Sequence, residues 1–522
     1  MTAGVVACAA TILGGGTLFR AGAERIVILH TNDTHSQIEP DASGAGGVLQ
    51  RKAVIDSVRA AEKNVILVDA GDMVQGSLYF KYFHGDVEYP VMNMMDYDVR
   101  ILGNHEFDNG LHELARYYKD VKGARLSANY DFSGTELDGI FTPYVVKKVG
   151  GKRIGFIGLN VDPASLIAKK SYEGMKFKEI IPVANETAAY LKNKEKCDLV
   201  VAVTHIGAVK ESEKTTDYEL AAASRDIDII IGGHSHTVIR PGEGGDYPSV
   251  VLNAEGRPVL VTQTGKYGKY VGEIVIDTDD FATRDARGYD YSLIPVTDRF
   301  PESKLDKKIS RFLEPYKAAV DSINNTVIAW SPARMDADSR TGAYPNFISD
   351  LVFDYAIGRA DSLRAAGVEI SRPDFAIMNV GGIRADMPEG DVTEGKILST
   401  FPFDNRIVIC RIKGSDVADA MRVAARKGGE GVSRNIRVIS DAEGNMEYLL
   451  LNGTEIDPER VYTYATIDYL AGGNDDLLGL GKGEIVWTDD VEYSVPVLTA
   501  VKRMGKRGQP VEADPQSRFI RR

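Results

Sequence analysis

Cysteine is scarce in this chain of 522 residues, and its three copies, Cys8, Cys197 and Cys410, lie far apart. This spacing matches neither the disulfide framework of a small secreted protein nor a zinc finger. Basic residues are also in deficit, because 62 lysines and arginines face 75 acidic residues and leave a formal charge of −13. Such a chain is poorly suited to bind nucleic acid polymers, although a few local cations suffice to hold a small anionic substrate.

The sequence also lacks an apolar run long enough to cross a bilayer. Residues 5–19 are apolar and glycine-rich, but they are fewer than the ~20 residues that a transmembrane helix needs. An Ala-Gly-Ala pattern then precedes Glu24, so we predict a signal peptide over residues 1–23 and an exported protein, whether periplasmic, cell-surface or secreted. A leader of another kind stays open, because no lysine or arginine precedes the apolar stretch.

Histidine is absent from the last 286 residues, since all eight histidines lie at or before position 236. Chemistry that needs imidazole is therefore confined to the first half. The length predicts at least two domains, which we place at 24–300 and 328–522. Between them, apolar side chains recur at helical spacing over 302–323 and predict a linker helix within 301–327. Pro315 is expected to bend or interrupt that helix.

Five short apolar runs in the first half each end in polar residues. The runs RIVIL, NVILV, VRIL, LVVAV and DIIIG lead into HTNDTH, DAGD, GNHEFD, THIG and GHSH. Runs without alternation predict strands buried on both faces, and helical stretches at 48–62 and 178–195 predict a layered α/β sheet. Ligands bind beyond the carboxyl ends of such strands. We therefore expect one shared site, formed by Asp33, His35, Asp72, Asn104, His105, Asp108, His205, His234 and His236.

The donors in this set are oxygen and imidazole atoms without thiolates, which suits Zn, Mn, Fe or Co. They are too many for one four-coordinate ion, whereas two ions about 3.5–4 Å apart, bridged by a carboxylate, use most of them. Such a pair activates a water and clamps a phosphoryl oxygen. Any one of these residues alone has a simpler structural interpretation, such as a turn cap for Asp72. Five clusters at five strand ends favour a common site.

The segments TNDTHSQIEP, DAGDMVQGS, LGNHEFDNG, VTHIG and GGHSH, in this order, resemble the calcineurin-like metallophosphoesterase domain of the secreted 5′-nucleotidase family. The resemblance implies a layered β-sandwich flanked by helices, followed by a second α/β domain that binds substrate. It also implies two divalent metal ions, zinc, manganese or similar. Their ligands would be Asp33, His35 and His236 for the first ion, Asn104, His205 and His234 for the second, and Asp72 as the bridge.

His105 is not a metal ligand in that family, so the resemblance gives it and Asp108 a different task. His105 would stabilise the phosphoryl transition state or assist the leaving group, with Asp108 as its partner. The chemistry agrees with this division. A carboxylate three residues after a histidine can fix its tautomer and favour its charged form, and a neighbouring asparagine can bind a metal without adding charge.

Three segments of the second half resemble the C-terminal domain of the same family. They are NVGGIRADMPEG at 379–390, FPFDN at 401–405 and YLAGGNDD at 469–476. Taken singly, each is an ordinary loop with a core aromatic. The resemblance implies that Asn379 and Arg384 contact the nucleotide and that Phe403 and Tyr469 stack on its base. Aromatic stacking tolerates different bases, so we expect broad base acceptance.

The sequence departs from the family pattern in three places. Tyr469 replaces the usual phenylalanine, and one residue is missing between it and the following glycines. Asn474 stands where the family has the aspartate that grips the ribose, with Asp475 directly after it. Arg340 lies two positions away from the arginine of the family's R-x-x-E segment. Asn474 and Arg340 are therefore weaker candidates for substrate contacts than the other positions.

The resulting prediction is a metal-dependent phosphoric ester hydrolase of nucleotide catabolism that releases phosphate from 5′-nucleoside monophosphates. The domains are expected to move about a hinge near 302–327. Three alternatives stay open: a 2′,3′-cyclic nucleotide phosphodiesterase and 3′-nucleotidase, a hydrolase of UDP-sugars or dinucleotides, and a non-catalytic nucleotide-binding surface module. The sequence does not determine the oligomeric state or the native metals.

Overall fold

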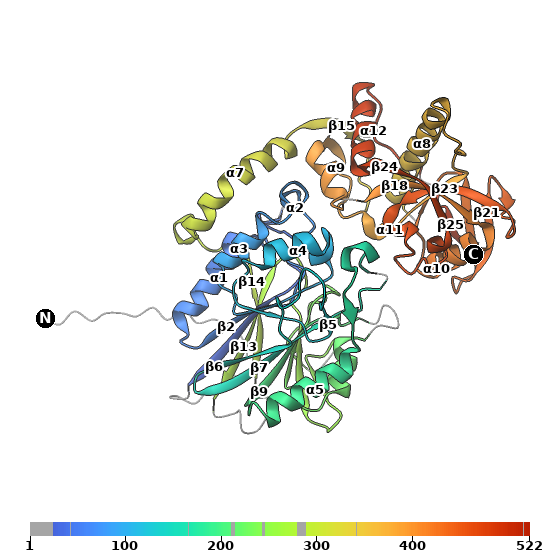
Figure 1. Ribbon diagram of the computed structural model, residues 1–522. Helices are drawn as coiled ribbons and strands as arrows, with labels where there is room; N and C mark the ends of the chain where they lie inside the picture. Colours follow the sequence, from blue (N-terminus) through green and yellow to red (C-terminus); the bar gives the residue numbers. More distant parts are fainter. Residues whose placement is uncertain are drawn as a thin grey trace.

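The computed structural model describes residues 24–41, 43–164, 166–209, 215–242, 246–278, 289–340, 342–403, 405–514 and 516–522. The predicted signal peptide, residues 1–23, lies outside this described part. Two sets of strands and helices follow one another along the chain and are joined by a long helix (Figure 1). In the described part, no helix is both long enough and apolar enough to cross a membrane.

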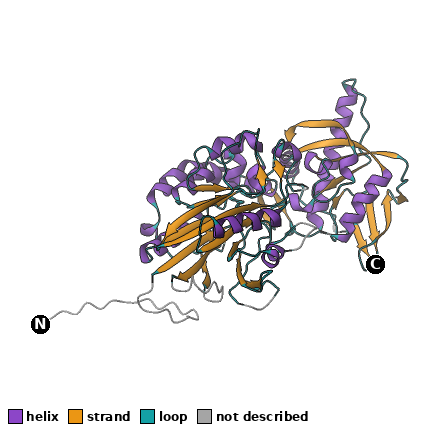
Figure 2. Ribbon diagram, turned by 60° about the horizontal axis from the view of Figure 1, so that its bottom comes forward, coloured by secondary structure: helices purple, strands orange, loops and turns teal. Residues whose placement is uncertain are grey.

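The first domain is built on two sheets that face each other (Figure 2). Buried side chains such as Ile28 and Ile66 of one sheet and Phe156 and Val201 of the other fill the space between them. The order of strands in the first sheet is β14 (Asp290–Pro295), β13 (Tyr270–Asp277), β1 (Arg25–Thr31), β2 (Val65–Asp69), β3 (Val99–Ile101) and β4 (Ala124–Leu126). The order in the second is β11 (Val250–Leu252), β12 (Pro258–Thr262), β10 (Ile229–Ile231), β9 (Leu199–His205), β7 (Lys152–Asn160) and β6 (Tyr144–Val149).

Helices cover the outer faces of this sandwich. Alternate residues of β1 explain the arrangement, because Ile28 points between the sheets and Leu29 packs against the helices of the other face. On the first sheet these helices are α1 (Val48–Ala61), α2 (Leu78–Phe83), α3 (Glu88–Met94) and α4 (Gly110–Tyr118). On the second they are α5 (Ile180–Asn193) and α6 (Asp217–Ala223), and a small pair, β5 (Tyr130–Asp131) and β8 (Lys176–Phe177), completes the domain. The predicted sandwich flanked by helices and its doubly buried strands are confirmed.

The linker helix α7 (Lys307–Asn324) runs along the first domain toward the second (Figure 1). Its apolar residues Ile309, Leu313 and Val320 join the core beneath α1 to α4. The helix continues through Pro315, so the expectation of an interruption there is wrong. Packing against the first domain holds the helix together where proline removes one backbone hydrogen bond.

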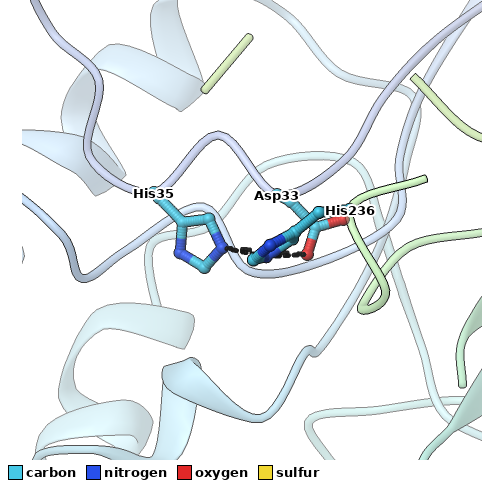
Figure 3. A group of neighbouring side chains, drawn as sticks. All are labelled: Asp33, His35 and His236. Atoms are coloured by element: carbon cyan, nitrogen blue, oxygen red, sulfur yellow. Dashed lines mark hydrogen bonds and ion pairs between the residues drawn. The ribbon is translucent and has the colours of Figure 1, made fainter. Parts of the chain in front are cut away.

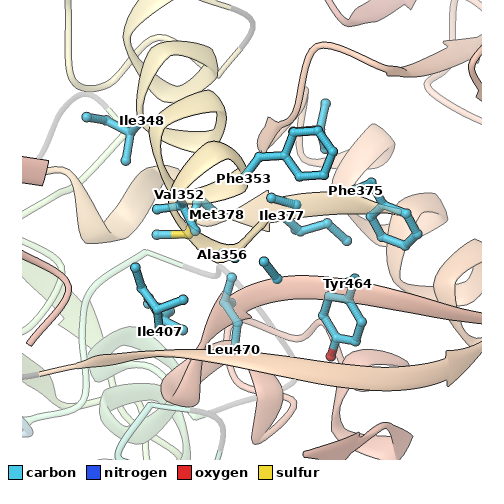
Figure 4. Close-up of a cluster of buried hydrophobic side chains, with 14 of the residues drawn as sticks. Ile348, Val352, Phe353, Ala356, Phe375, Ile377, Met378, Ile407, Tyr464 and Leu470 are labelled. Atoms are coloured by element: carbon cyan, nitrogen blue, oxygen red, sulfur yellow. The ribbon is translucent and has the colours of Figure 1, made fainter. Parts of the chain in front are cut away.

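The second domain has its own core between a mixed sheet and its helices. Ile348, Val352 and Phe353 of one helix pack over Ile377 and Tyr464 of the sheet (Figure 4). The sheet has the order β19 (Gly431–Val432), β16 (Phe375–Met378), β23 (Val461–Ile467), β18 (Arg406–Lys413) and β24 (Glu484–Glu492). Smaller sheets join β15 (Val327–Ser331) to β17 (Gly390–Thr393), and place β22 (Thr454–Glu455), β21 (Met446–Leu451), β20 (Ile436–Ser440) and β25 (Phe519–Arg521) in that order. The helices are α8 (Ala343–Ala365), α9 (Glu394–Thr400), α10 (Gly414–Arg426), α11 (Asp468–Ala471) and α12 (Ser494–Lys506).

The two domains contact each other through α2. This short helix lies beside α7 and α9, and Lys81 on it forms a close ion pair with Glu492 at the end of β24. A second ion pair joins Lys170 of the first domain to Asp468 at the start of α11, with 3.0 Å between nitrogen and oxygen. In this arrangement the second domain lies against one edge of the sandwich.

Candidate active site

The polar residues predicted as one site lie at the carboxyl ends of five strands. β1, β2 and β3 are parallel to one another, and so are β9 and β10, so their ends meet at common edges of the two sheets. Asp33 and His35 follow β1, Asp72 follows β2, Asn104 follows β3, His205 ends β9, and His234 and His236 follow β10. The strand order therefore brings together residues that are up to 203 positions apart.

The first group of candidate ligands consists of Asp33, His35 and His236 (Figure 3). The Nε2 atoms of the two histidines are 2.9 Å apart. Oδ1 of Asp33 lies 3.6 Å from Nε2 of His236 and 3.8 Å from Nε2 of His35. Two imidazole nitrogens and one carboxylate oxygen thus converge on one point, which is the donor set that a borderline divalent metal prefers.

The second group consists of Asp72, His205 and His234. Nδ1 of His205 donates to the carbonyl oxygen of Ala70 at 2.7 Å, so the neutral ring carries its lone pair on Nε2. That Nε2 is buried and lies 3.1 Å from Oδ2 of Asp72. A ring fixed by a backbone carbonyl, with its other nitrogen directed at a carboxylate, is typical of a metal-ligating histidine. Asn104 lies beside this group, with Oδ1 2.8 Å from Nδ1 of His234.

His105 sits between the two groups and contacts both Asp72 and Asp108. Its backbone nitrogen donates to Oδ1 of Asp72 at 2.9 Å. Its ring Nδ1 lies 3.0 Å from Oδ2 of Asp108. Asp72, His35 and His105 also form a third cluster of possible ligands. Asp72 belongs to two of the three clusters and is therefore the central carboxylate, whereas Asp108 takes up one ring nitrogen of His105.

Burial and neighbouring charges shift the ionisation of this site strongly. Burial raises the pKa of Asp33 to about 7. Burial acts in the same direction on Asp72, but the facing imidazoles of His205 and His105 outweigh it and hold the pKa of Asp72 well below its usual range. Burial lowers the pKa of His205, but Asp72 and Asp33 outweigh it and raise this pKa to about 10. Two buried carboxylates that face imidazoles rather than lysine or arginine favour a cation between them.

Several of these side chains stand on left-handed backbone, which residues other than glycine rarely adopt. The φ angles are 49° at Asp33, 45° at His35, 54° at Asp72, 79° at His234 and 56° at His236. Such conformations persist only where the surrounding structure enforces them, and they concentrate at functional sites. The backbone of these loops is therefore shaped to direct the side chains inward.

Two glycines of the predicted motifs leave room for the ligands. A Cβ atom on Gly103 would lie 2.1 Å from Oδ1 of Asp72. A Cβ on Gly233 would lie 2.8 Å from Nδ1 of His205. Glycine is thus required at Gly103 and Gly233 because ligand side chains approach the backbone closely, and not because the chain turns there.

Gly103→Ala is expected to displace the Asp72 carboxylate and lower kcat/KM by about 100-fold, because a shift of about 1 Å in a positioned group has that effect. Phosphate release and metal content would both be measured. The matched control is Gly358→Ala in α8, where an added Cβ meets nothing within 4 Å. A Gly103→Ala enzyme with normal kcat/KM would contradict the proposed tight fit around Asp72.

Glu106 was given no role by the sequence, yet it joins two of the loops. Its carboxylate accepts from the backbone nitrogens of Asp72 at 3.1 Å, Met73 at 2.9 Å and Gly103 at 2.5 Å. Burial raises its pKa to about 7. A carboxylate that binds backbone donors leaves no spacing pattern in the sequence. The only available signal was an acidic residue directly after His105.

A cavity of about 340 Å³ joins the metal-ligand groups to the second domain. From the first domain it is lined by Asp72, Asn104, His105, Asp108, His234 and His236. From the second it is lined by Asn379, Arg384, Phe403, Tyr469 and Asp475. The substrate-binding residues predicted in the second half therefore meet the first-domain site in one space, except for two positions.

Those two positions are Asn474 and Arg340. The side chain of Asn474 donates to the carbonyl oxygen of Tyr469 at 2.7 Å and does not line the cavity, where Asp475 appears instead. Arg340 bonds Oε1 of Glu430 at 2.8 Å and lines a neighbouring cavity of about 440 Å³. Asp475, the residue after Asn474, thus lines the cavity, and Arg340 pairs with Glu430 instead.

Side chains of the two domains touch inside the shared cavity. The ring of Phe403 stacks against that of His105, with centroids 5.8 Å apart and planes at 27°. The guanidinium of Arg384 lies 5.9 Å from the centroid of Phe403. A positive charge and an aromatic face from the second domain are thus held beside the ligands of the first.

Comparisons with known proteins agree with this arrangement. A family model for calcineurin-like phosphoesterases matches residues 26–238, and a model for the 5′-nucleotidase C-terminal domain matches residues 322–480. A snake venom 5′-nucleotidase from Naja atra is 28% identical over 93% of this chain and 97% of its own length. The trifunctional nucleotide phosphoesterase YfkN of Bacillus subtilis is also 28% identical, but the match covers 76% of this chain and 27% of that longer protein.

Among solved structures, a 5′-nucleotidase precursor from Thermus thermophilus has the same architecture. It superposes with a TM-score of 0.78 at 27% identity, and the match covers 95% of this chain and 99% of that one. The two matched domains follow one another in the order seen in the structure, and the related proteins carry 5′-nucleotidase names. The chain therefore belongs to the 5′-nucleotidase family of metal-dependent phosphoesterases, in which a calcineurin-like phosphoesterase domain is followed by a 5′-nucleotidase C-terminal domain.

Proposed function

We propose that this chain is an exported two-metal hydrolase that releases phosphate from 5′-nucleoside monophosphates. The observation that carries the proposal is the single cavity in which the histidine and aspartate clusters face Phe403 and Tyr469. A phosphate at the clusters leaves the rest of a nucleotide within reach of the aromatic rings. Export is supported by the A-x-A pattern before Glu24 and by similarity to a venom enzyme.

The donor set fits two divalent ions such as zinc or manganese. Asp33, His35 and His236 would hold one ion, Asn104, His205 and His234 the other, and Asp72 both. When bound, the ions supply Lewis-acid stabilisation of the phosphoryl oxygens. The surroundings of His205 support this assignment, because the backbone carbonyl of Ala70 holds its Nδ1 while its buried Nε2 faces the Asp72 carboxylate.

His105 is proposed to donate a proton or hydrogen bond to the reacting phosphate ester. Asp108 accepts from Nδ1, which leaves Nε2 as the atom available to the substrate. Asp108 and Asp72 favour the charged form of the ring, and against the opposing effect of burial they raise the pKa of His105. Arg384 adds a second positive group at the same cavity, suited to the phosphate by its planar fork.

The nucleoside is proposed to bind against the second domain. Phe403 and Tyr469 offer aromatic faces, and each stacked base contributes roughly 1–3 kcal/mol. Asp475, which lines the cavity where Asn474 does not, is the proposed acceptor for the ribose hydroxyls. Arg340 is not part of this proposal, because it pairs with Glu430 outside the shared cavity.

A panel of nucleotides assayed for released phosphate tests the function. We expect the highest kcat/KM with 5′-monophosphates of several bases. Preference for 2′,3′-cyclic or 3′-nucleotides, or for UDP-sugars and dinucleotides, would replace the proposed substrate class. A protein that binds metal and nucleotide and releases no phosphate would instead be a binding module.

Turnover is proposed to need movement of the domains about α7, since residues of both domains line the cavity and the nucleotide would lie between them. Cysteines at Lys81 and Glu492, joined by a short cleavable crosslinker, are expected to reduce turnover at least tenfold until the linker is cut, because opening limits exchange of ligand. The control is a crosslink within α1 between cysteines at Lys52 and Asp56, which form an ion pair inside one domain. Unaltered turnover in the interdomain crosslinked protein would overturn the hinge proposal.

A further inference from the structure

The loop after α11 has a strained backbone, and side chains from other segments support it. Asp475 and Asp476 have φ angles of 56° and 60°, so two consecutive residues other than glycine are left-handed. Such a pair is unfavourable unless its surroundings enforce it. The side chains that hold Asp475 in this conformation therefore indicate the function of the loop.

Three side chains from different segments hold Asp475. The hydroxyl of Tyr469 donates to Oδ1 at 3.0 Å, and Nδ2 of Asn379 donates to Oδ2 at 2.6 Å. Nζ of Lys427, just beyond α10, donates to the backbone carbonyl oxygen of Asp475 at 2.7 Å. Each carboxylate oxygen thus has one protein donor, and the peptide behind it has a third. The direction of the carboxylate is fixed before any ligand arrives.

The carboxylate held in this way keeps the capacity to bind a ligand. Two carboxylate oxygens have about four acceptor positions, and the protein donors occupy two of them. Asp475 lines the shared cavity together with Tyr469 and Asn379. Oδ1 of Asn379 is buried and has no hydrogen-bond partner in the described part of the chain. A ligand that presents two adjacent donors suits this surface, and a vicinal pair of hydroxyls is such a ligand.

We propose that the Tyr469 hydroxyl is a positioning group for Asp475, and that the pair selects nucleotides whose 2′ and 3′ hydroxyls are both free. The inference rests on the proposed function, because the nucleoside must lie against Phe403 and Tyr469 for its ribose to reach Asp475. The ring of Tyr469 serves the base, while its hydroxyl serves the sugar through the carboxylate. Ribose carrying a 2′- or 3′-phosphate would bring negative charge to Asp475 and is disfavoured.

The test compares Tyr469→Phe with the unaltered full-length protein, because phenylalanine keeps the ring and removes only the donor. Adenosine and 2′,3′-dideoxyadenosine are titrated calorimetrically, and kcat/KM is measured for AMP. Loss of a hydrogen bond to a charged group is expected to weaken adenosine binding about tenfold, while dideoxyadenosine binding changes about twofold or less. The kcat/KM for AMP should fall by the same factor as adenosine binding.

Tyr464→Phe is the matched control, since its hydroxyl donates at 3.2 Å to the backbone oxygen of Leu480 within the core. This variant should leave the preference for adenosine over dideoxyadenosine unchanged. Equal weakening of both nucleosides by Tyr469→Phe, or no weakening of either, would overturn the positioning role. Because nucleoside binding does not require hydrolysis, absent phosphate release in the unaltered protein would count against the proposed function alone.

Discussion

Removal of divalent ions by a chelator is expected to lower phosphate release at least about 10³-fold, because metal ions in this site would lie closest to the charge on the phosphoryl oxygens. Arg384 and His105 line the cavity, and neither would replace two ions held by Asp33, Asp72 and the histidines. Zinc or manganese added back should restore turnover. Metal content before and after treatment, measured together with kcat, checks the expectation.

A variant makes the same test without a chelator. Asp72→Asn should resemble the chelated protein and resist rescue by added metal, because Asp72 belongs to two of the three ligand clusters. The control is Asp228→Asn, which removes a buried carboxylate that pairs with Lys192 beside the opposite end of β10. Full activity in metal-free protein, confirmed by elemental analysis, would show that the clusters serve another purpose.

His105→Asn is expected to lower kcat by about 10²- to 10⁴-fold, the range that a positioned proton donor contributes. Both metal ions should remain bound, because Nδ1 of His105 is directed at Asp108. The neighbouring variant Asn104→Ala should instead reduce occupancy of one ion, since Oδ1 of Asn104 lies beside His234 in the second group. Kinetics and metal analysis of the two variants, side by side, separate the two tasks.

The opposite pattern would overturn this assignment. If His105→Asn emptied a metal position while Asn104→Ala left both ions in place, the two neighbours would have exchanged roles. The third cluster, which includes His105 with His35 and Asp72, makes that outcome a real alternative. In the stretch LGNHEFDNG, this pair of variants thus separates the proposed functions of the neighbours Asn104 and His105.

The first-domain site could be predicted from sequence because each of its residues follows an apolar run directly. The strand fixes the position of Asp33 or His205 locally, and parallel pairing then brings the strand ends together. The packing of the two sheets against each other determines only which strand ends lie close together. Family resemblance supplied the division of roles, which spacing alone does not contain.

The second-domain site was harder to predict, because small changes in backbone determine which side chain faces the ligand. A left-handed turn places Asp475 rather than Asn474 at the cavity. The sequence is one residue shorter than the family pattern before this turn, but that difference does not reveal which side chain faces the cavity. Arg340 is held by Glu430, 90 positions away, and no local pattern reveals such a pair. The role of Glu106 is not predictable from sequence for a related reason, since its partners are backbone nitrogens.

The stacking of Phe403 on His105 would make one aromatic ring common to the proposed base site and the proposed proton donor. The imidazole lies against one face of that ring, so a nucleobase would have to stack on the opposite face. A base bound there would restrict the movement of Phe403 and, through the stacked rings, that of His105. Phosphate esters without a base would leave Phe403 unrestrained, so we expect His105 to be held most firmly when the base site and the phosphate site are both occupied.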